Sequence, residues 1–162
     1  MTIIISDTSP LHYLVLIGES QVLPALYVRI IIPQKVLEEL RQPNTPAVVQ
    51  AFANAPPSWL EVRTISSPPD SSLDNLDPGE REAIALALEL QANTLLIDDL
   101  AGREAALLHG LEIVGTMGVL YAAAEAGLCE LKDAFGKLRQ TNFRASAALY
   151  QSFLDLIEQS RP

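Results

Sequence analysis

The sequence predicts a three-layer α/β fold built around a mainly parallel central sheet. Short aliphatic and β-branched runs, which are typical of buried strands, alternate with longer stretches of helix-forming residues. Strands that are separated by helices pair in parallel by default, because the helical crossover returns the chain to the same edge of the sheet. Acidic residues stand directly after two of the apolar runs, at Asp7 and at Asp98-Asp99. The carboxyl ends of parallel strands line the crevice in which such folds bind ligands.

The elements of the first half are recognised by composition and by their stop signals. Gly18 ends an apolar helical turn, Pro33 suits the first turn of a helix, and Pro56-Pro57 closes another helix. We expect a strand at 3–5, a helical turn at 11–17, a strand at 28–32, helices at 34–41 and 44–53, and a strand at 60–65.

The second half has the clearer signals. Asp77-Pro78-Gly79-Glu80 combines an N-cap, a proline at the first helical position and an acid at the third, which predicts a helix start. We expect helices at 77–90, 101–109, 116–126, 131–138 and 145–157, and strands at 94–97 and 112–114.

Length and composition favour one domain over residues 1–162. A chain of 162 residues, 49% of them hydrophobic, can bury a substantial core without a second domain. No apolar stretch approaches the roughly 18–20 residues of a membrane span, and the start lacks the basic region of a secretory signal. The single cysteine, Cys129, is interpreted as a small buried residue on a helix and fits a reducing compartment. We therefore expect a cytoplasmic protein with no membrane association.

The net charge of −9 argues against a surface that holds nucleic acid by phosphate neutralisation alone. Metal ions in a carboxylate pocket would supply the missing positive charge. Between Lys132 and Arg144, by contrast with the acidic stretch from Ser66 to Asp99, basic residues outnumber acidic ones. That stretch is interpreted either as a solvated helix face or as a contact for phosphates or an acidic partner.

Acidic residues from separate elements are the candidates for one site. They are Asp7, Glu39, Glu80, Asp98 and Asp99. Mg²⁺ and Mn²⁺ prefer carboxylate oxygens and water, and Mg²⁺ uses few protein ligands. Without a cation, two carboxylates about 4 Å apart repel by roughly 4 kcal/mol at an effective dielectric of 20. Bound metal or raised pKa values would relieve that cost.

Each acid also has a structural alternative. Asp7 would cap the helix that begins near Pro10, and one member of Asp98-Asp99 would cap the helix after it. Glu39 would lie on a solvated helix face, and Glu80 would complement a helix dipole. The sequence leaves open which member of the aspartate pair faces the site.

Four acidic motifs follow one another along the chain: Asp7-Thr8-Ser9, Val36-Leu37-Glu38-Glu39-Leu40, Gly79-Glu80-Arg81-Glu82-Ala83 and Leu95-Leu96-Ile97-Asp98-Asp99. In this order they resemble the acidic motifs of PIN-domain ribonucleases. The later segments 103–106, 110–120 and 126–128 resemble an uncharacterised prokaryotic branch close to the VapC-type toxins. The resemblance defines a motif-bearing core at 1–128 and extends more loosely over C-terminal helices at 129–162.

The resemblance implies an α/β/α PIN-like fold that binds Mg²⁺ or Mn²⁺ and hydrolyses single-stranded RNA. It implies metal-binding roles for Asp7, Glu80, Asp98 and Asp99, and a place for Glu39 among the catalytic acids. Ser9 resembles the hydroxyl residue that hydrogen-bonds within that site, with helix capping as its alternative. One departure is Glu80, where the toxins usually carry aspartate, and Glu82 is an alternative for its role.

The resemblance also implies partners. VapC-like toxins usually form homodimers and are held silent by a small antitoxin. The function that the resemblance implies is therefore that of a metal-dependent endoribonuclease that acts as the toxin of a toxin–antitoxin pair. The alternative is a degenerate PIN domain that binds RNA or protein without catalysis.

Several residues outside the acidic motifs have less defined roles. Arg103 would reach a substrate phosphate or pair with a site carboxylate, whereas His12 and His109 are expected to lie apart from the acids. Apolar residues of the last helices are interpreted as core, with a dimer or antitoxin face as the alternative. They are Phe143, Leu149, Tyr150, Phe153, Leu154 and Ile157.

Overall fold

The computed structural model describes residues 2–160, and its centre is a five-stranded sheet in the order β3-β2-β1-β4-β5. All the strand pairs are parallel. The strands are β1 (Ile4–Ser6), β2 (Ile30–Pro33), β3 (Leu60–Arg63), β4 (Thr94–Leu96) and β5 (Ile113–Val114). The expected three-layer α/β fold with a mainly parallel sheet is confirmed.

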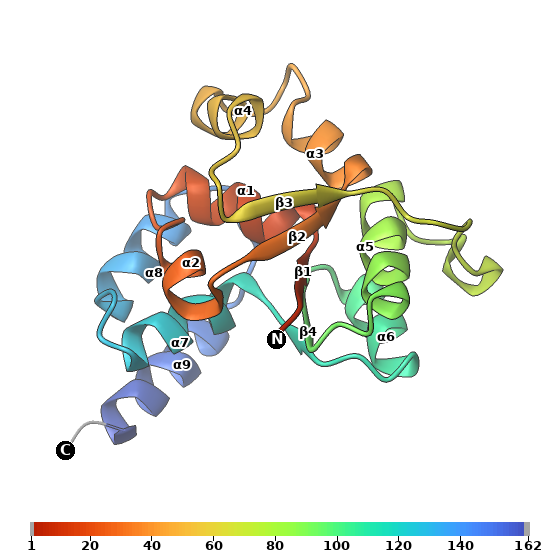
Figure 1. The fold of residues 1–162 in the computed structure, drawn as a ribbon. Coiled ribbons are helices and arrows are strands. Elements are labelled where there is room, and N and C mark those ends of the chain that lie inside the picture. The colour runs from red at the N-terminus through yellow and green to blue at the C-terminus, as the bar shows by residue number, and fades with distance from the viewer. Residues whose placement is uncertain (1, 161–162) are drawn as a thin grey trace.

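Helices cover both faces of this sheet (Figure 1). The first half contains α1 (Thr8–Leu16), α2 (Val22–Tyr27), α3 (Gln34–Leu40) and α4 (Ala47–Asn54). The second half contains the short 3₁₀ helix η1 (Ser71–Leu73), then α5 (Pro78–Glu89), α6 (Leu100–Leu108), α7 (Thr116–Glu125), α8 (Leu131–Arg139) and α9 (Ala147–Ser160).

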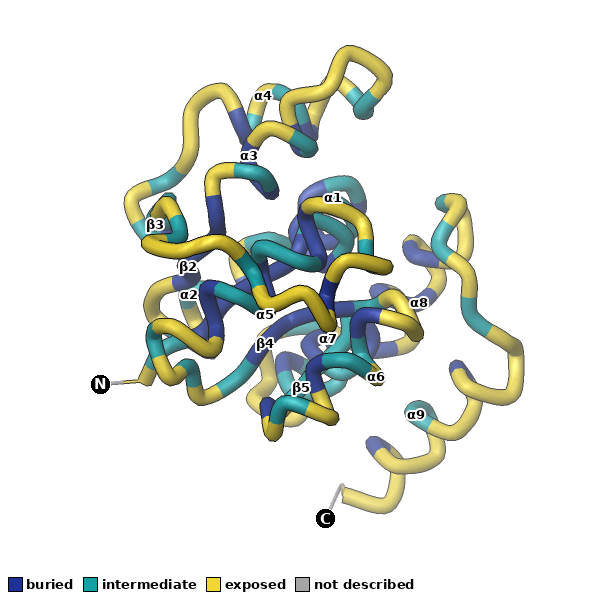
Figure 2. The backbone as a smooth tube through the Cα atoms, turned by 90° about the vertical axis from the view of Figure 1, so that its right-hand side faces the viewer, coloured by how far each residue is buried: buried dark blue, intermediate teal, exposed yellow. Residues whose placement is uncertain are grey.

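Side chains that alternate between the two faces of the strands divide the core into two clusters. Ile4 and Ile32 pack with the residues of α1, α2, α3, α7 and α8, whereas Ile5 and Ile31 pack with those of α5 and α6. Successive strand side chains point to opposite faces, so a strand buried on both sides is apolar throughout. Figure 2 shows the strands β2 and β4 as buried, and α9 as largely exposed at the edge of the molecule.

The strand order places the first and fourth strands side by side. From β1 the chain proceeds outward through β2 to β3, and it then returns to add β4 and β5 on the other side of β1. The gap between β1 and β4 is thus the point at which the order reverses, where open α/β sheets form their ligand crevice. Asp7 directly follows β1, and its backbone N–H donates to the Leu96 carbonyl of β4 at 2.9 Å. The acids after these two strands are therefore neighbours.

Most expected elements lie within a few residues of their observed bounds, and the differences have local causes. The first helix begins at Thr8 rather than at residue 11, because Pro10 occupies its first turn without losing a needed hydrogen bond. The helix α2 was not expected. Its last residue is Tyr27. The next residue, Val28, has a φ of 67° and changes the direction of the chain, so β2 begins at Ile30 rather than at residue 28.

Among the helices of the described residues, none is long and apolar enough to cross a membrane.

The two-sided burial of β1 predicts a large stability cost for truncation there. Ile5 is 0% exposed, so Ile5→Ala should lower the free energy of unfolding by about 2–5 kcal/mol through lost burial and a cavity. Leu108, which is 88% exposed, is the matched control. Leu108→Ala should change the free energy of unfolding by less than about 0.5 kcal/mol. Urea unfolding of the two variants measures both changes in unfolding free energy. Equal changes would contradict the burial of β1 on both of its faces.

Candidate active site

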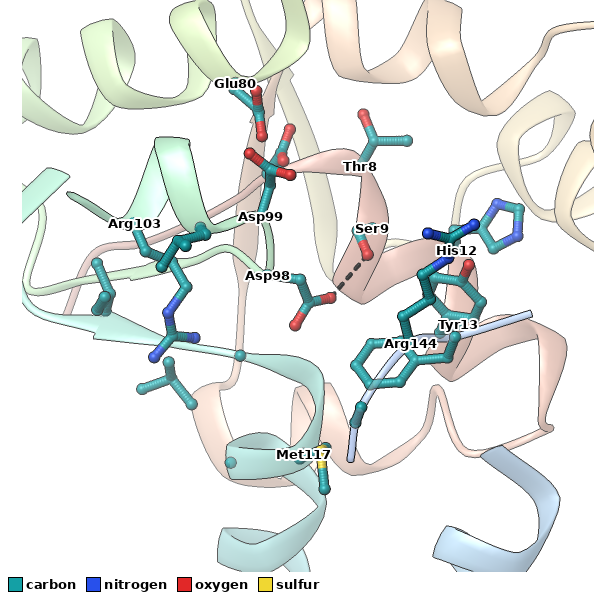
Figure 3. Close-up of a pocket in the computed structure, with 18 of the residues that line it drawn as sticks. Thr8, Ser9, His12, Tyr13, Glu80, Asp98, Asp99, Arg103, Met117 and Arg144 are labelled. Carbon is teal, nitrogen blue, oxygen red and sulfur yellow. Dashed lines mark hydrogen bonds between the residues drawn. The ribbon is translucent and has the colours of Figure 1, made fainter. Parts of the chain in front are cut away.

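A groove of about 1140 Å³ opens at the carboxyl ends of β1 and β4. All five acids expected from the sequence line it, together with Ser9 and Arg103. The full acidic lining is Asp7, Glu39, Asp77, Glu80, Asp98 and Asp99. Figure 3 shows Glu80, Asp99 and Asp98 following one another along the groove, with Ser9 directed at Asp98. The topology therefore gathers acids that are far apart in sequence.

Asp7 is the most buried of these acids. It is 4% exposed, and among the described residues its buried Oδ1 has no hydrogen-bond partner. Burial raises the pKa of Asp7 from its ordinary value of 3.8 to about 7, with further increases from the charges of Asp77, Glu39 and Asp98. Although Asp7 occupies the N-cap position of α1, its side chain makes no capping hydrogen bond. The capping interpretation of Asp7 is wrong.

Glu80 combines a structural role with a place in the groove. Its backbone N–H donates to Asp77 Oδ1 at 2.9 Å, and its Oε1 accepts from the Asp77 backbone at 3.3 Å, which completes a capping box. The Glu80 side chain nevertheless lines the groove, and the residue is 5% exposed. Burial, followed by the charges of Asp77, Asp7 and Asp99, raises the pKa of Glu80 to about 8. Glu82 does not line the groove.

Glu39 is held in the groove from the far end of α3. Thr8 Oγ1 donates to Glu39 Oε1 at 2.5 Å, and the Gly79 backbone also hydrogen-bonds the carboxylate. Burial raises the pKa of Glu39 above its ordinary value, and these hydrogen bonds partly oppose the rise. Its neighbour Glu38 is exposed and lies 3.9 Å from Lys35. Of these two adjacent glutamates, Glu39 is therefore the one that lines the groove.

The two aspartates after β4 have different environments. Asp98 accepts hydrogen bonds from Ser9 Oγ at 2.7 Å and from the Thr116 backbone N–H and hydroxyl at 2.7 and 2.6 Å. Asp99 is the N-cap of α6, where its Oδ2 accepts from the Ala101 N–H at 3.2 Å. Asp99 therefore caps a helix while still lining the groove, and Asp98 is the member that neighbouring side chains fix in place.

Three glycines leave room for three of the carboxylates. A methyl group on Gly79 would collide with the Glu39 carboxylate, and one on Gly115 would lie 2.9 Å from Asp98 Oδ1. At Gly102 it would lie 3.2 Å from Glu80 Oε2 and 2.6 Å from an Ile97 methyl carbon. The carboxylates approach the backbone of α5 and the start of α7 this closely because no Cβ stands in the way.

The groove is also lined by cationic and aromatic side chains. Arg103 donates from Nη1 to the Ile97 carbonyl at 3.3 Å, and Arg144 projects beside Tyr13 in Figure 3. The Tyr13 and Phe143 rings meet edge to face with centroids 5.0 Å apart. His12 also lines the groove, so the expectation that it lies apart from the acids is wrong. Helix periodicity would have placed His12 one turn after Thr8, on the same side of α1.

Other residues singled out from the sequence lie elsewhere. His109 ends α6 and meets Ser72 Oγ at 3.3 Å. Cys129 is half-buried between α7 and α8 rather than buried on a helix, and its thiol donates to the Leu120 carbonyl. Tyr150 and Ile157 of the C-terminal group are buried in the core. Phe143, Leu149 and Phe153 line the groove.

The groove matches the chemistry of a hard divalent cation. Its acidic lining offers only oxygen donors, and Asp7 Oδ1 is buried with no partner in the described part of the chain. Within residues 2–160, no three His, Cys, Asp or Glu side chains stand close enough together to form a ready-made ligand set. A cation such as Mg²⁺, which keeps several waters and takes one or two carboxylates, does not need such a set.

Sequence and structure comparisons place the chain in a family. Residues 3–159 match the family described as DUF3368, PIN domain. The chain therefore belongs to the PIN-domain family, whose members are commonly nucleases. Its fold is similar to that of a PilT N-terminus domain protein, SSO1118, from the hyperthermophilic archaeon Sulfolobus solfataricus P2. The TM-score is 0.50 at 17% identity, over 90% of this chain and 100% of that one. No curated protein matches the sequence.

The raised pKa values predict a pH-dependent stability for the metal-free protein. The folded-state pKa values of Asp7, about 7, and Glu80, about 8, exceed the unfolded ones, so the folded state binds more protons in between. Stability should therefore fall as the pH rises from about 4 to about 8. We expect the melting temperature, measured in the presence of a chelator, to drop by at least about 4 °C across this window. Each 1 kcal/mol of lost unfolding free energy lowers the melting temperature of a domain of this size by about 2–4 °C.

Thermal unfolding at a series of pH values tests this dependence, with Asp7→Asn as the comparison. The variant cannot ionise at this position, so its melting temperature should depend less steeply on pH. A slope as steep as that of the wild type would show that Asp7 does not carry the effect.

The contact between Glu39 and Gly79 predicts a second stability effect. Gly79→Ala places a methyl group against the Glu39 carboxylate and should cost about 1–3 kcal/mol of unfolding free energy. Gly136→Ala is the matched control, because open space surrounds this glycine in α8 and alanine favours a helix by up to about 1 kcal/mol. Urea unfolding measures both. In a Glu39→Ala background the cost of Gly79→Ala should shrink, and an unchanged cost would exclude the contact as its cause.

Proposed function

We propose that this PIN domain is a divalent-metal-dependent endoribonuclease that hydrolyses phosphodiester bonds of single-stranded RNA. The observation that carries the proposal is the convergence of acids on one groove around Asp7, whose buried Oδ1 lacks a partner within the described residues. The raised pKa values of Asp7 and Glu80 indicate that this arrangement is unfavourable while both are ionised. A bound cation would remove that cost.

In this proposal Asp7, Glu80, Asp98 and Asp99 hold Mg²⁺ or Mn²⁺. A divalent ion bound there supplies an activated water and neutralises charge on the scissile phosphate. Ser9 and Thr116 fix the orientation of Asp98 through the hydrogen bonds to its carboxylate. Thr8 orients Glu39, which adds negative charge at the edge of the acid cluster.

The same groove offers contacts for the RNA backbone. The chain is acidic overall, so phosphates must be met by local positive charge. Arg103 and Arg144 both line the groove and lie on either side of Asp98 in Figure 3, where a bound strand would pass between them. The aromatic rings of Tyr13 and Phe143 stand beside Arg144 and suit contact with unpaired bases, which stack on aromatic side chains. These features favour a single strand over a duplex.

We also propose that the protein is the toxin of a toxin–antitoxin pair, works as a homodimer and is silenced by a small antitoxin. Support comes from the exposed apolar side chains at the rim of the groove. Leu100 is 70% exposed and Leu149 is 45% exposed, and both line it. A partner that covered these residues would also block the acids.

A second candidate function is that of a non-catalytic RNA-binding or protein-binding PIN domain. The specific observation in its favour is that the acids within residues 2–160 do not form a ready ligand set of three. The two candidates differ in whether Asp7 is needed for any activity on RNA.

The nuclease proposal predicts a sharp dependence on Asp7. Purified protein with Mn²⁺ should cut single-stranded RNA, and Asp7→Asn should slow cleavage by more than the roughly 10–100-fold that losing a partner of a metal ligand costs. The loss of cleavage rate caused by Ser9→Ala should fall within that range of roughly 10–100-fold, because this substitution removes one hydrogen bond to Asp98. Glu82→Gln is the matched control, since Glu82 lies outside the groove, and its rate should match the wild type.

Gel analysis of a mixed pool of structured and single-stranded RNAs, with and without EDTA, measures these rates. Equal cleavage by the wild type and by Asp7→Asn would assign the activity to a contaminant or to another site. No cleavage by a folded wild type across the whole pool would favour the non-catalytic candidate.

The toxin proposal makes a separate prediction in cells. Induced expression of the wild type without its partner should arrest bacterial growth, whereas Asp7→Asn at the same level should not. Sedimentation should give twice the mass of the 17.6 kDa chain. Normal growth with an active, well-expressed wild type would rule out toxicity in that host, and a monomeric mass would rule out the dimer.

A further inference from the structure

A second hollow of about 690 Å³ adjoins the acidic groove, and we call it the amide hollow. It shares the lining residues His12, Glu39 and Asn142 with the groove, so the two spaces adjoin each other. The amide hollow is lined by His12, Leu16, Glu39, Gln42, Asn44, Thr45, Pro46, Thr141 and Asn142. These residues come from α1, from α3 and the loop after it, and from the segment after α8. Its size is that of a pocket for a small molecule or part of a chain.

The lining of the amide hollow is polar but almost uncharged. Glu39, at the junction with the groove, is the one acidic side chain among its lining residues. Burial lowers the pKa of His12 below its ordinary value, which keeps the ring neutral and able to donate one hydrogen bond and accept another. The side chains of Gln42, Asn44 and His12 make no hydrogen bond within residues 2–160. They are therefore available to a ligand.

Neighbouring hydrogen bonds fix the walls of the amide hollow. Gln50 Nε2 donates to the Thr45 and Pro43 carbonyls at 2.6 and 3.0 Å, which ties down the loop that carries Asn44. Tyr13 donates its hydroxyl to Asn142 Oδ1 at 2.7 Å. Because the Asn142 oxygen is occupied, its NH₂ group is the part left to bind a ligand. Fixed donors and acceptors select a ligand by its hydrogen-bonding pattern.

This chemistry suits a nucleobase and excludes a phosphate. A phosphate requires positive charge, and no arginine or lysine lines the amide hollow. Asn and Gln amides match the donor and acceptor edges of bases, and unpaired RNA bases are recognised through such edges together with aromatic stacking. The Tyr13 and Phe143 rings lie in the adjoining groove, next to the shared residues.

We propose that the amide hollow is the subsite for one unpaired nucleotide of the RNA, next to the phosphate that lies in the acidic groove. Asn44, Asn142 and Gln42 contact the edge of its base, and Tyr13 is a positioning residue that orients Asn142. The inference rests on the proposed ribonuclease function. It adds the position at which the protein distinguishes one base from another.

The test compares base preference rather than overall rate. Wild type, Asn44→Ala, Asn142→Ala and Tyr13→Phe each cut an RNA pool with a randomised segment, and sequencing of the products gives the preference at each position flanking the cut. We expect one flanking position to show a preference that each variant reduces about 3–10-fold, as expected for one lost hydrogen bond. Asn54→Ala is the matched control on α4, because Asn54 lines neither space.

A binding arm separates failure of the subsite from failure of the proposed function. Fluorescence anisotropy of RNA hexamers of U, C, A or G on Asp7→Asn protein should rank the four bases, and adding Asn142→Ala should flatten the ranking. Cleavage with no flanking preference, or with a preference that all three variants keep, overturns the subsite alone. If the wild type cuts no RNA, the proposed nuclease function is contradicted, and hexamer binding alone tests the subsite. Equal binding of all four hexamers would then overturn the subsite as well. That result is expected of a hollow that binds an antitoxin segment instead.

Discussion

The repulsion between carboxylates at the ends of β1 and β4 is the constraint on which the rest of this structure depends. Asp7 lies at the centre of the cluster, where burial above all, and then the charges of its acidic neighbours, raise its pKa to about 7. A fold gains nothing in stability from such an arrangement. The cation proposed for this groove would offset that cost.

The surroundings reduce the repulsion through backbone dipoles and hydroxyl groups rather than through ion pairs. Glu39 approaches the N-terminus of α5 at Gly79, and Asp98 accepts the N–H of Thr116 at the N-terminus of α7. Helix N-termini carry partial positive charge, which favours carboxylates without filling the groove with basic side chains. Gly79 and Gly115 permit these two approaches. The groove thus stays open to a cation and to a phosphate.

The acids themselves could be predicted from the sequence, because Asp7 and Asp98-Asp99 directly follow apolar strands and all the acids stand in the order of the PIN-domain motifs. Their neighbours could not, since contacts such as Ser9 with Asp98 or Thr8 with Glu39 depend on strand order, which composition does not fix. The same applies to Asn142, which meets Tyr13 across more than a hundred residues. The helix α2 was missed because Pro24 within its first turn resembles a loop signal. The catalytic roles of the acids, the metal and the partners remain predictions.

The most direct test of the central claim is a crystal structure of the protein with Mn²⁺ at about pH 7.5, near the raised pKa values, analysed by anomalous scattering at the manganese edge. We predict a peak in the acidic groove bound by Asp7 Oδ1 and by at least one oxygen of Glu80, Asp98 or Asp99. An ordered groove without a peak, in which Asp7 Oδ1 still has no partner, would contradict the account.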